Sequence, residues 1–363
     1  MRLLYLLLCL PFAVIAQTED AQIYNSEAPE LVLLWNRVGD VSDGLQSVEA
    51  AEFSPDGRLA VSGGKFGYAV MLWRVADGTL LWERAHESEV ECVTFSPDGT
   101  RIATGGEDYY LRVWDTETGE QLHAVEMSAA GFDGITWSPD GRYIVGGDEA
   151  GQAVFFDGTT YEQVATVDCG STINSLEFTA DGKQLLVGGN IQTPDPNGPG
   201  GNRYTGFAKI INVASMEVIR DIGEQPGSIK SVRYSADEKL FATGGFDNKA
   251  RLFDAATGKL VREFTNPLKI EAVAFTPDGQ YLATGGHEQA INFYRLSDGE
   301  LALRLPMARV EYIHFTRNGR LMLTSHEDSG LLSCYLLQSN TQSRGNYQQI
   351  ADKQLNNRDL KND

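Results

Sequence analysis

Three features of the sequence predict an all-β fold, a seven-bladed β-propeller of four-stranded antiparallel blades. A short motif recurs seven times at a nearly constant spacing. Each copy is followed by strand-like segments separated by glycine turns, and no segment between the copies shows the apolar spacing of a helix. Four short strands in about 42 residues are typical of one propeller blade. We therefore expect a single ring-shaped domain over residues 31–337.

The recurring motif is an aromatic residue that ends a short apolar run, followed by a turn such as Ser54-Pro55-Asp56-Gly57. Proline after a small residue presets the turn, aspartate caps it, and glycine adopts the left-handed conformation. The motif therefore marks the end of one strand and the start of the next. Its aromatic residues, spaced by 42, 42, 41, 56, 41 and 40 residues, are Phe53, Phe95, Trp137, Phe178, Tyr234, Phe275 and Phe315.

Three further strands are expected after each aromatic residue. In blade one, the second strand ends at Gly63-Gly64, the third runs up to Trp73, and the turn Asp77-Gly78 opens the fourth. The last blade offers only three strands, because the chain turns polar after Leu337. Leu33-Leu34-Trp35-Asn36-Arg37 closely matches Leu80-Leu81-Trp82-Glu83-Arg84, the fourth strand of blade one. We expect this N-terminal strand to complete blade seven and to close the ring, which removes an exposed sheet edge.

Blade two carries a fuller signature: His86 before the first strand, Thr104 in the second, Asp108 in the next turn, and then Trp114-Asp115. With these residues the chain resembles the Trp-Asp (WD) repeat family of β-propellers. The resemblance implies that His86, Thr104, Asp108 and Trp114 form a structural hydrogen-bond chain. It implies this for blade two only, because the other blades lose part of the signature. WD-type propellers are mostly binding platforms, so the resemblance also implies a binding role.

Segments outside the repeats have their own predictions. Residues 1–16 are typical of a signal peptide, with Arg2, an apolar run and small residues before a cleavage point after Ala16. The mature protein is then exported, to the periplasm or the extracellular space. We expect a linker at 17–30, an insertion loop in blade four at 190–206, and a polar, mostly disordered tail at 338–363.

The composition restricts the partners. The chain has 363 residues, with 30 Lys and Arg against 50 Asp and Glu, and a net charge of −20. Such a surface repels phosphate backbones, which argues against nucleic acid. No run of apolar residues is long enough to predict a transmembrane segment. We expect a monomeric propeller that binds another protein through a basic segment.

The sequence offers little catalytic chemistry. It lacks nucleophile-elbow, phosphate-loop and His-Glu-x-x-His motifs, so we expect no catalytic residue, no cofactor and no metal. Cys92, Cys169 and Cys334 lack the spacing of zinc or redox motifs. His287 and His326, each followed by a glutamate, are expected to face solvent from equivalent turns. The alternative is a hydrolase or lactonase-like enzyme, which predicts that both histidines converge with carboxylates at the channel mouth.

The main candidate site is the residue four positions before each aromatic residue. The WD resemblance implies that this position lies at the rim of the central channel. Five of the seven residues are acidic, although Asp and Glu make up only about 14% of the chain. Further acidic residues expected at or near this rim are Glu89, Asp148, Glu288 and Glu327. We predict a non-catalytic platform that binds a basic segment, a polyamine-like cation or a divalent ion, with Lys230 fixing the orientation. The seven rim residues are Glu49, Glu91, Asp133, Asn174, Lys230, Glu271 and Glu311.

Overall fold

The computed structural model describes residues 22–23, 28–38, 47–126, 130–198 and 201–338. Over these residues the chain forms thirty strands and no helix. Accordingly, the described part of the chain contains no helix long and apolar enough to cross a membrane. The expected signal peptide at 1–16 and all but the first residue of the expected tail at 338–363 lie outside the described residues.

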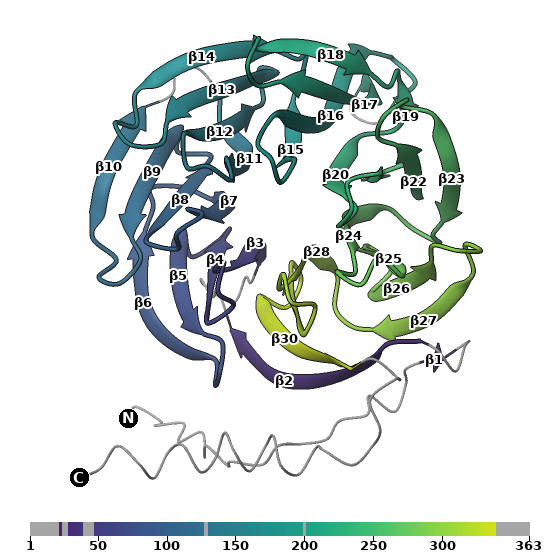
Figure 1. Ribbon diagram of the computed structural model, residues 1–363, viewed down its shortest axis with the longest axis horizontal. Helices are drawn as coiled ribbons and strands as arrows, with labels where there is room; N and C mark the ends of the chain where they lie inside the picture. The colour runs from purple at the N-terminus through teal and green to yellow at the C-terminus, as the bar shows by residue number, and fades with distance from the viewer. Residues whose placement is uncertain (1–21, 24–27, 39–46, 127–129, 199–200, 339–363) are drawn as a thin grey trace.

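The strands form seven antiparallel sheets arranged around a central channel (Figure 1). The innermost strand of each blade packs against the innermost strands of its two neighbours, so the seven inner strands line the channel in a closed ring. The predicted seven-bladed propeller is therefore confirmed. Blades one to three are β3 Val48–Phe53, β4 Leu59–Gly64, β5 Ala69–Arg74 and β6 Thr79–Ala85; β7 Val90–Phe95, β8 Arg101–Gly106, β9 Tyr110–Asp115 and β10 Gln121–Glu126; and β11 Phe132–Trp137, β12 Tyr143–Asp148, β13 Gln152–Asp157 and β14 Gln163–Asp168. Blades four to seven are β15 Ile173–Phe178, β16 Gln184–Pro194, β17 Asn202–Asn212 and β18 Glu217–Asp221; β20 Ile229–Tyr234, β21 Leu240–Gly245, β22 Lys249–Asp254 and β23 Leu260–Thr265; β24 Ile270–Phe275, β25 Tyr281–Gly286, β26 Ala290–Arg295 and β27 Leu301–Pro306; and β28 Val310–Phe315, β29 Leu321–His326, β30 Leu331–Gln338 and β2 Glu30–Val38.

The N-terminal strand closes the ring as predicted. β2 pairs with β30 from Leu31↔Leu337 to Val38↔Leu331 and is the outer strand of blade seven. In Figure 1 the purple β2 lies beside the yellow β30. Trp35 Nε1 donates to the carbonyl oxygen of Val75 at 2.7 Å, and its counterpart Trp82 makes the same kind of bond to the next blade. The two similar outer strands thus have equivalent roles.

The segment before β2 adds to blade six. β1 (Gln22–Ile23) pairs with the outer strand β27, so part of the expected linker at 17–30 is a fifth strand of this sheet. At the bulge of β27, Ala302 is fully buried, whereas the bulge residues Leu81 and Val164 of other outer strands are 40% and 51% exposed. Ala28 also packs into the apolar cluster around Ala302. In the described part of the chain, β1 and Ala28 therefore cover the only outer strand that carries a small residue at this bulge.

Residues 190–194 and 202–206 of blade four form strand pairs, in contrast to the prediction of a loop over all of 190–206. β16 and β17 continue their ladder past Gly189, with pairs from Asn190↔Gly206 to Pro194↔Asn202. The pairing continues because the residues added to β16 are matched by those added to β17. Pro194, which lacks an N–H group, stands at the last pair, where its missing donor matters least. The result is a hairpin that is longer than those of the other blades. A two-residue strand, β19 (Gln225–Pro226), pairs with β17 at Gly206, near the base of this hairpin.

Candidate functional site: the channel rim

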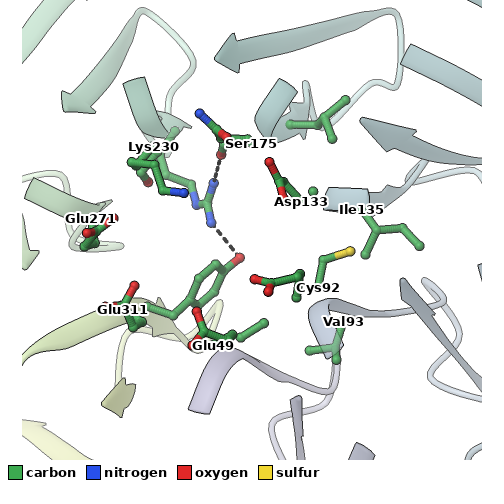
Figure 2. A pocket seen from close by; sticks show the side chains of 17 residues that line it. Glu49, Cys92, Val93, Asp133, Ile135, Ser175, Lys230, Glu271 and Glu311 are labelled. Carbon is green, nitrogen blue, oxygen red and sulfur yellow. Dashed lines mark hydrogen bonds between the residues drawn. The ribbon is translucent and has the colours of Figure 1, made fainter. Parts of the chain in front are cut away.

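All seven predicted rim residues line one cavity of about 700 Å³ in the central channel, including the part open to solvent (Figure 2). Each stands at a β-bulge, where the register of the inner strand shifts against the second strand. In blade one the shift falls between Val48 and Ala50, which leaves Glu49 as the extra residue. A bulge redirects a side chain, and here the same bulge in every blade gives seven side chains the same position.

Two further positions per blade belong to the rim. The residue after the last pair between the inner and second strands donates its backbone N–H to the carbonyl of the residue two positions before the rim residue, as from Glu107 to Glu89 at 3.1 Å. The same bond recurs in all seven blades at 2.8–3.3 Å. The three rim positions are therefore fixed relative to one another by backbone geometry. The additional donor–acceptor pairs are Lys65 and Ser47, Glu107 and Glu89, Glu149 and Gly131, Asn190 and Thr172, Phe246 and Ser228, His287 and Lys269, and Glu327 and Arg309.

One arginine pairs with all three rim carboxylates of blades six and seven. Arg309 lies 3.1 Å from Glu271 Oε1 and 3.1 Å from Glu311 Oε1, and it also pairs with Glu327. His287 Nε2 adds a contact of 2.8 Å to Glu271. Burial, followed by the charge of Glu271, raises the pKa of Glu311 well above its usual range. This side of the rim is an internally paired network.

Blades one and four also satisfy their rim residues internally. Lys65 Nζ lies 3.2 Å from Glu89 Oε2 and 3.9 Å from Glu49 Oε1, so it draws one carboxylate of blade two toward blade one. Asn174 Nδ2 donates to Asn190 Oδ1 at 3.1 Å, at the base of the long hairpin. Neither Glu49 nor Asn174 is left without a partner.

Glu91, Asp133 and Lys230 differ from the other rim residues. The side chains of Asp133 and Lys230 have no hydrogen bond or ion pair with any residue in the described part of the chain, and Glu91 bonds only to Glu89. Burial raises the pKa of Asp133 to about 6. It also raises the pKa of Glu91 well above the usual value, with the charge of Glu49 adding to the effect. Burial opposes the charge of Lys230, but neighbouring carboxylates, Glu271 first, raise its pKa. In Figure 2 Asp133 and Lys230 both point into the cavity.

An acidic trio lies beside these residues. The carboxylate oxygens of Glu107, Asp133 and Glu149 lie within 4.8 Å of one another. Burial, and then the charge of Glu149, raises the pKa of Glu107. An all-oxygen set of this kind suits a hard cation such as Ca²⁺ or Mg²⁺ rather than zinc.

A hydrogen-bonded bar crosses the channel beneath the rim. Arg233 donates to Ser175 Oγ at 3.0 Å and to the Tyr312 hydroxyl at 2.5 Å, which joins blades four, five and seven (dashed lines in Figure 2). Burial raises the pKa of Glu52 to about 7 and that of Glu177 to about 7. The sequence analysis did not single out this layer. Its signal was available, because Glu52, Glu177 and Arg233 each stand directly before an aromatic residue of the repeat.

The four residues of the WD signature meet in blade two. His86 lies 3.1 Å from Asp108 Oδ2 and 2.9 Å from Thr104 Oγ1, and Trp114 Nε1 donates to Thr104 at 2.9 Å. Burial lowers the pKa of His86. Although burial acts the other way, the hydrogen bond from His86 lowers the pKa of Asp108 to about 2.

Blade six has an equivalent chain that sequence reasoning missed. Asn266 donates to Thr284 Oγ1 at 2.8 Å and to Glu288 Oε1 at 2.6 Å, and the Tyr294 hydroxyl donates to Asn266 at 2.8 Å. Glu288, expected near the rim, is therefore buried inside its blade. Asp148, also expected there, is buried and accepts a bond from the backbone of Gln152 at 2.7 Å. Glu89 and Glu327 do lie at the rim.

The two histidines do not converge. His326 is 2% exposed and contacts Thr324, Ser333 and the carbonyl of Ala308, so the expectation that it faces solvent is wrong. The error is one of register, since Val310↔His326 corresponds to Ile270↔Gly286, one residue before His287. Burial lowers the pKa of His326 to about 4.

Comparison with known families agrees with the blade pattern. The family model described as "WD domain, G-beta repeat" matches residues 76–115, 217–254 and 258–295. Each match covers the outer strand of one blade and the three inner strands of the next. A search of curated proteins gives no match. WD propellers are typically platforms for protein interaction and are usually non-catalytic. The three matched repeats and the seven-bladed ring together identify the chain as a WD-repeat β-propeller.

Proposed function

We propose that this protein is an exported, monomeric, non-catalytic binding platform that holds a basic segment of another protein at its channel rim. The uneven charge of the rim is the observation that supports the proposal. At the three rim positions, blades two and three carry five carboxylates and no basic residue. The other five blades together carry four acidic and four basic residues at these positions. The acidic pole consists of Glu89, Glu91, Glu107, Asp133 and Glu149.

The surroundings of the acidic pole favour a cationic partner. Like charges held in a partly buried concave site focus a negative field, which raises the association rate of cations and weakens with salt. Burial raises the pKa values of Asp133 and Glu91, and neither carboxylate forms an ion pair with a described residue, although the charges of Lys230 and Lys65 act on them from a distance. A lysine or arginine of a partner would supply the missing charge. Export adds that the partner resides in the envelope or outside the cell.

The experiment is capture of the natural partner by the mature protein from the cell envelope fraction. The double variant Glu91→Gln, Asp133→Asn should bind about tenfold more weakly at low salt and lose most of the salt dependence of the parent. Glu162→Gln, an exposed carboxylate on the outside of blade three, is the matched control and should bind as the parent does. Equal capture by the double variant and the parent would show that the acidic pole only solubilises the protein.

Export is tested separately by determining the N-terminus of the protein recovered from each cell fraction. The proposal expects a chain that begins at Gln17 in the envelope or the medium. A chain that retains Met1 in the cytoplasm contradicts this part of the proposal and leaves the binding role to be judged by capture.

A further inference from the structure

The cavity contains an unpaired cation as well as unpaired carboxylates. Lys230 points into the same cavity as Asp133, and neither side chain is paired with a described residue. A segment that carried only positive charge would place its charge beside Lys230 when it reached Asp133. Like charges in a shared, partly buried cavity repel, so Lys230 selects against such a segment.

A second lysine extends this cationic side of the rim. Lys269 Nζ lies 4.3 Å from the centre of the Phe246 ring, and Lys230 Nζ lies 5.9 Å from it. Among the described residues neither Lys269 nor Lys230 has a carboxylate within ion-pair distance, although the charges of Glu271, Asp133 and Glu311 act on Lys230 from further away. Those two glutamates form ion pairs with Arg309. The rim thus has the acidic pole on blades two and three and a cationic patch, formed by Lys230 and Lys269, on blades five and six.

The Arg233 bar lies in the channel beneath the rim. Arg233, Ser175 and Tyr312 line the cavity, and the hydrogen bonds from Arg233 to Ser175 and Tyr312 cross the channel there. The side chains of a partner can reach the rim residues from the open side above this bar. Two oppositely charged side chains from one surface segment fit this geometry.

We infer that the bound segment is of mixed charge, with a lysine or arginine directed at Glu91 and Asp133 and a nearby aspartate or glutamate directed at Lys230 and Lys269. This inference rests on the proposed binding role of the rim and specifies its partner. Specificity then comes from repulsion of purely basic segments as well as from attraction of the mixed one.

The test uses two synthetic peptides with blocked ends, one containing Lys-Gly-Glu and one containing Lys-Gly-Lys, titrated against the mature protein and its variants at low salt. The parent should prefer the mixed peptide. Lys230→Gln should weaken the mixed peptide several-fold and tighten the dilysine peptide several-fold, so the two effects have opposite sign. Lys259→Gln, an exposed lysine on a turn of the same blade, is the matched control and should change neither affinity.

The outcomes separate this inference from the proposed function. If Lys230→Gln tightens both peptides, the rim binds cations but does not read mixed charge, and the inference fails alone. If Asp133→Asn leaves the binding of both peptides unchanged, the acidic pole is not a binding surface and both fail.

Discussion

The two sides of the channel rim contain similar residues in different states of pairing. Blades six and seven place three carboxylates around Arg309, so each of them has an ion-pair partner within the protein. Blades two and three place five carboxylates at equivalent positions, and only Glu89 has a basic partner, Lys65 of blade one. The backbone is the same on both sides, because the bulge and the rim hydrogen bond recur in every blade. The difference shows that an acidic rim is not a uniform feature. Pairing determines which carboxylates remain available to a partner.

The largest effect on stability is expected from replacing Arg309, the arginine of blade seven that pairs with three carboxylates. Arg309→Gln should lower the free energy of unfolding by about 2–3 kcal/mol, because Glu271, Glu311 and Glu327 lie close together and lose the arginine with which all three pair. Denaturant unfolding measures the change. Arg320→Gln, an exposed arginine of the same blade, should change the stability by less than about 0.5 kcal/mol. Similar stability of both variants would show that Arg309 does not hold this side together.

The buried glutamates in the layer beneath the rim should make the stability of the protein depend on pH. In the folded state Glu52 and Glu177 have pKa values of about 7, above the value of 4.5 for an exposed glutamate. Between these values the folded state binds more protons than the unfolded state, so stability is lost as pH rises from about 4.5 to 7.

Glu52→Gln removes one of these groups. The free energy of unfolding of the variant, measured relative to that of the parent, should therefore rise by roughly 1–3 kcal/mol as the pH increases from 5 to 8. Denaturant unfolding at a series of pH values gives this difference directly. A difference that stays constant with pH means that Glu52 titrates normally and is hydrated in the channel.

The smallest effect compares one carboxylate from each side. At pH 8, Asp133→Asn should raise the free energy of unfolding by about 0.5–1 kcal/mol, because it removes a desolvated charge that has no partner. Glu271→Gln should not stabilise the protein in this way, because its carboxylate lies 3.1 Å from Arg309 and 2.8 Å from His287. The decisive result is the sign of the difference in the free energy of unfolding between the two variants. If both stabilise the protein equally, the two sides of the rim do not differ in pairing.

The sequence predicted the fold and the rim positions well because both depend on a repeated register. An aromatic residue and a Ser-Pro-Asp-Gly turn fix where each inner strand ends, and the residue four positions earlier then occupies the same bulge in every blade. The sequence could not predict the pairing. Lys65 and Arg309 reach their partners through long flexible side chains, whose direction depends on charges contributed by other blades.

The errors have equally local causes. The residues at 190–206 are rich in proline, glycine and asparagine, and this composition favoured a loop. In the structure residues 190–194 instead pair with 202–206 and extend the two strands. The chain in blade six was missed because asparagine, glutamate and tyrosine replace the signature residues while keeping their hydrogen-bonding roles. His326 was misplaced by one residue, and in a strand one residue exchanges the buried and exposed faces.

The closing strand has a consequence for how the molecule assembles. β2 is synthesised before any complete blade, yet its partner β30 lies about 300 residues later, so the last contact of the ring joins the two ends of the chain. Contacts of such sequence separation form slowly, and until then blade seven lacks its outer strand. The chain therefore remains an open arc until its synthesis is almost complete. Closure of the ring therefore depends on a contact that can form only once all seven blades are present.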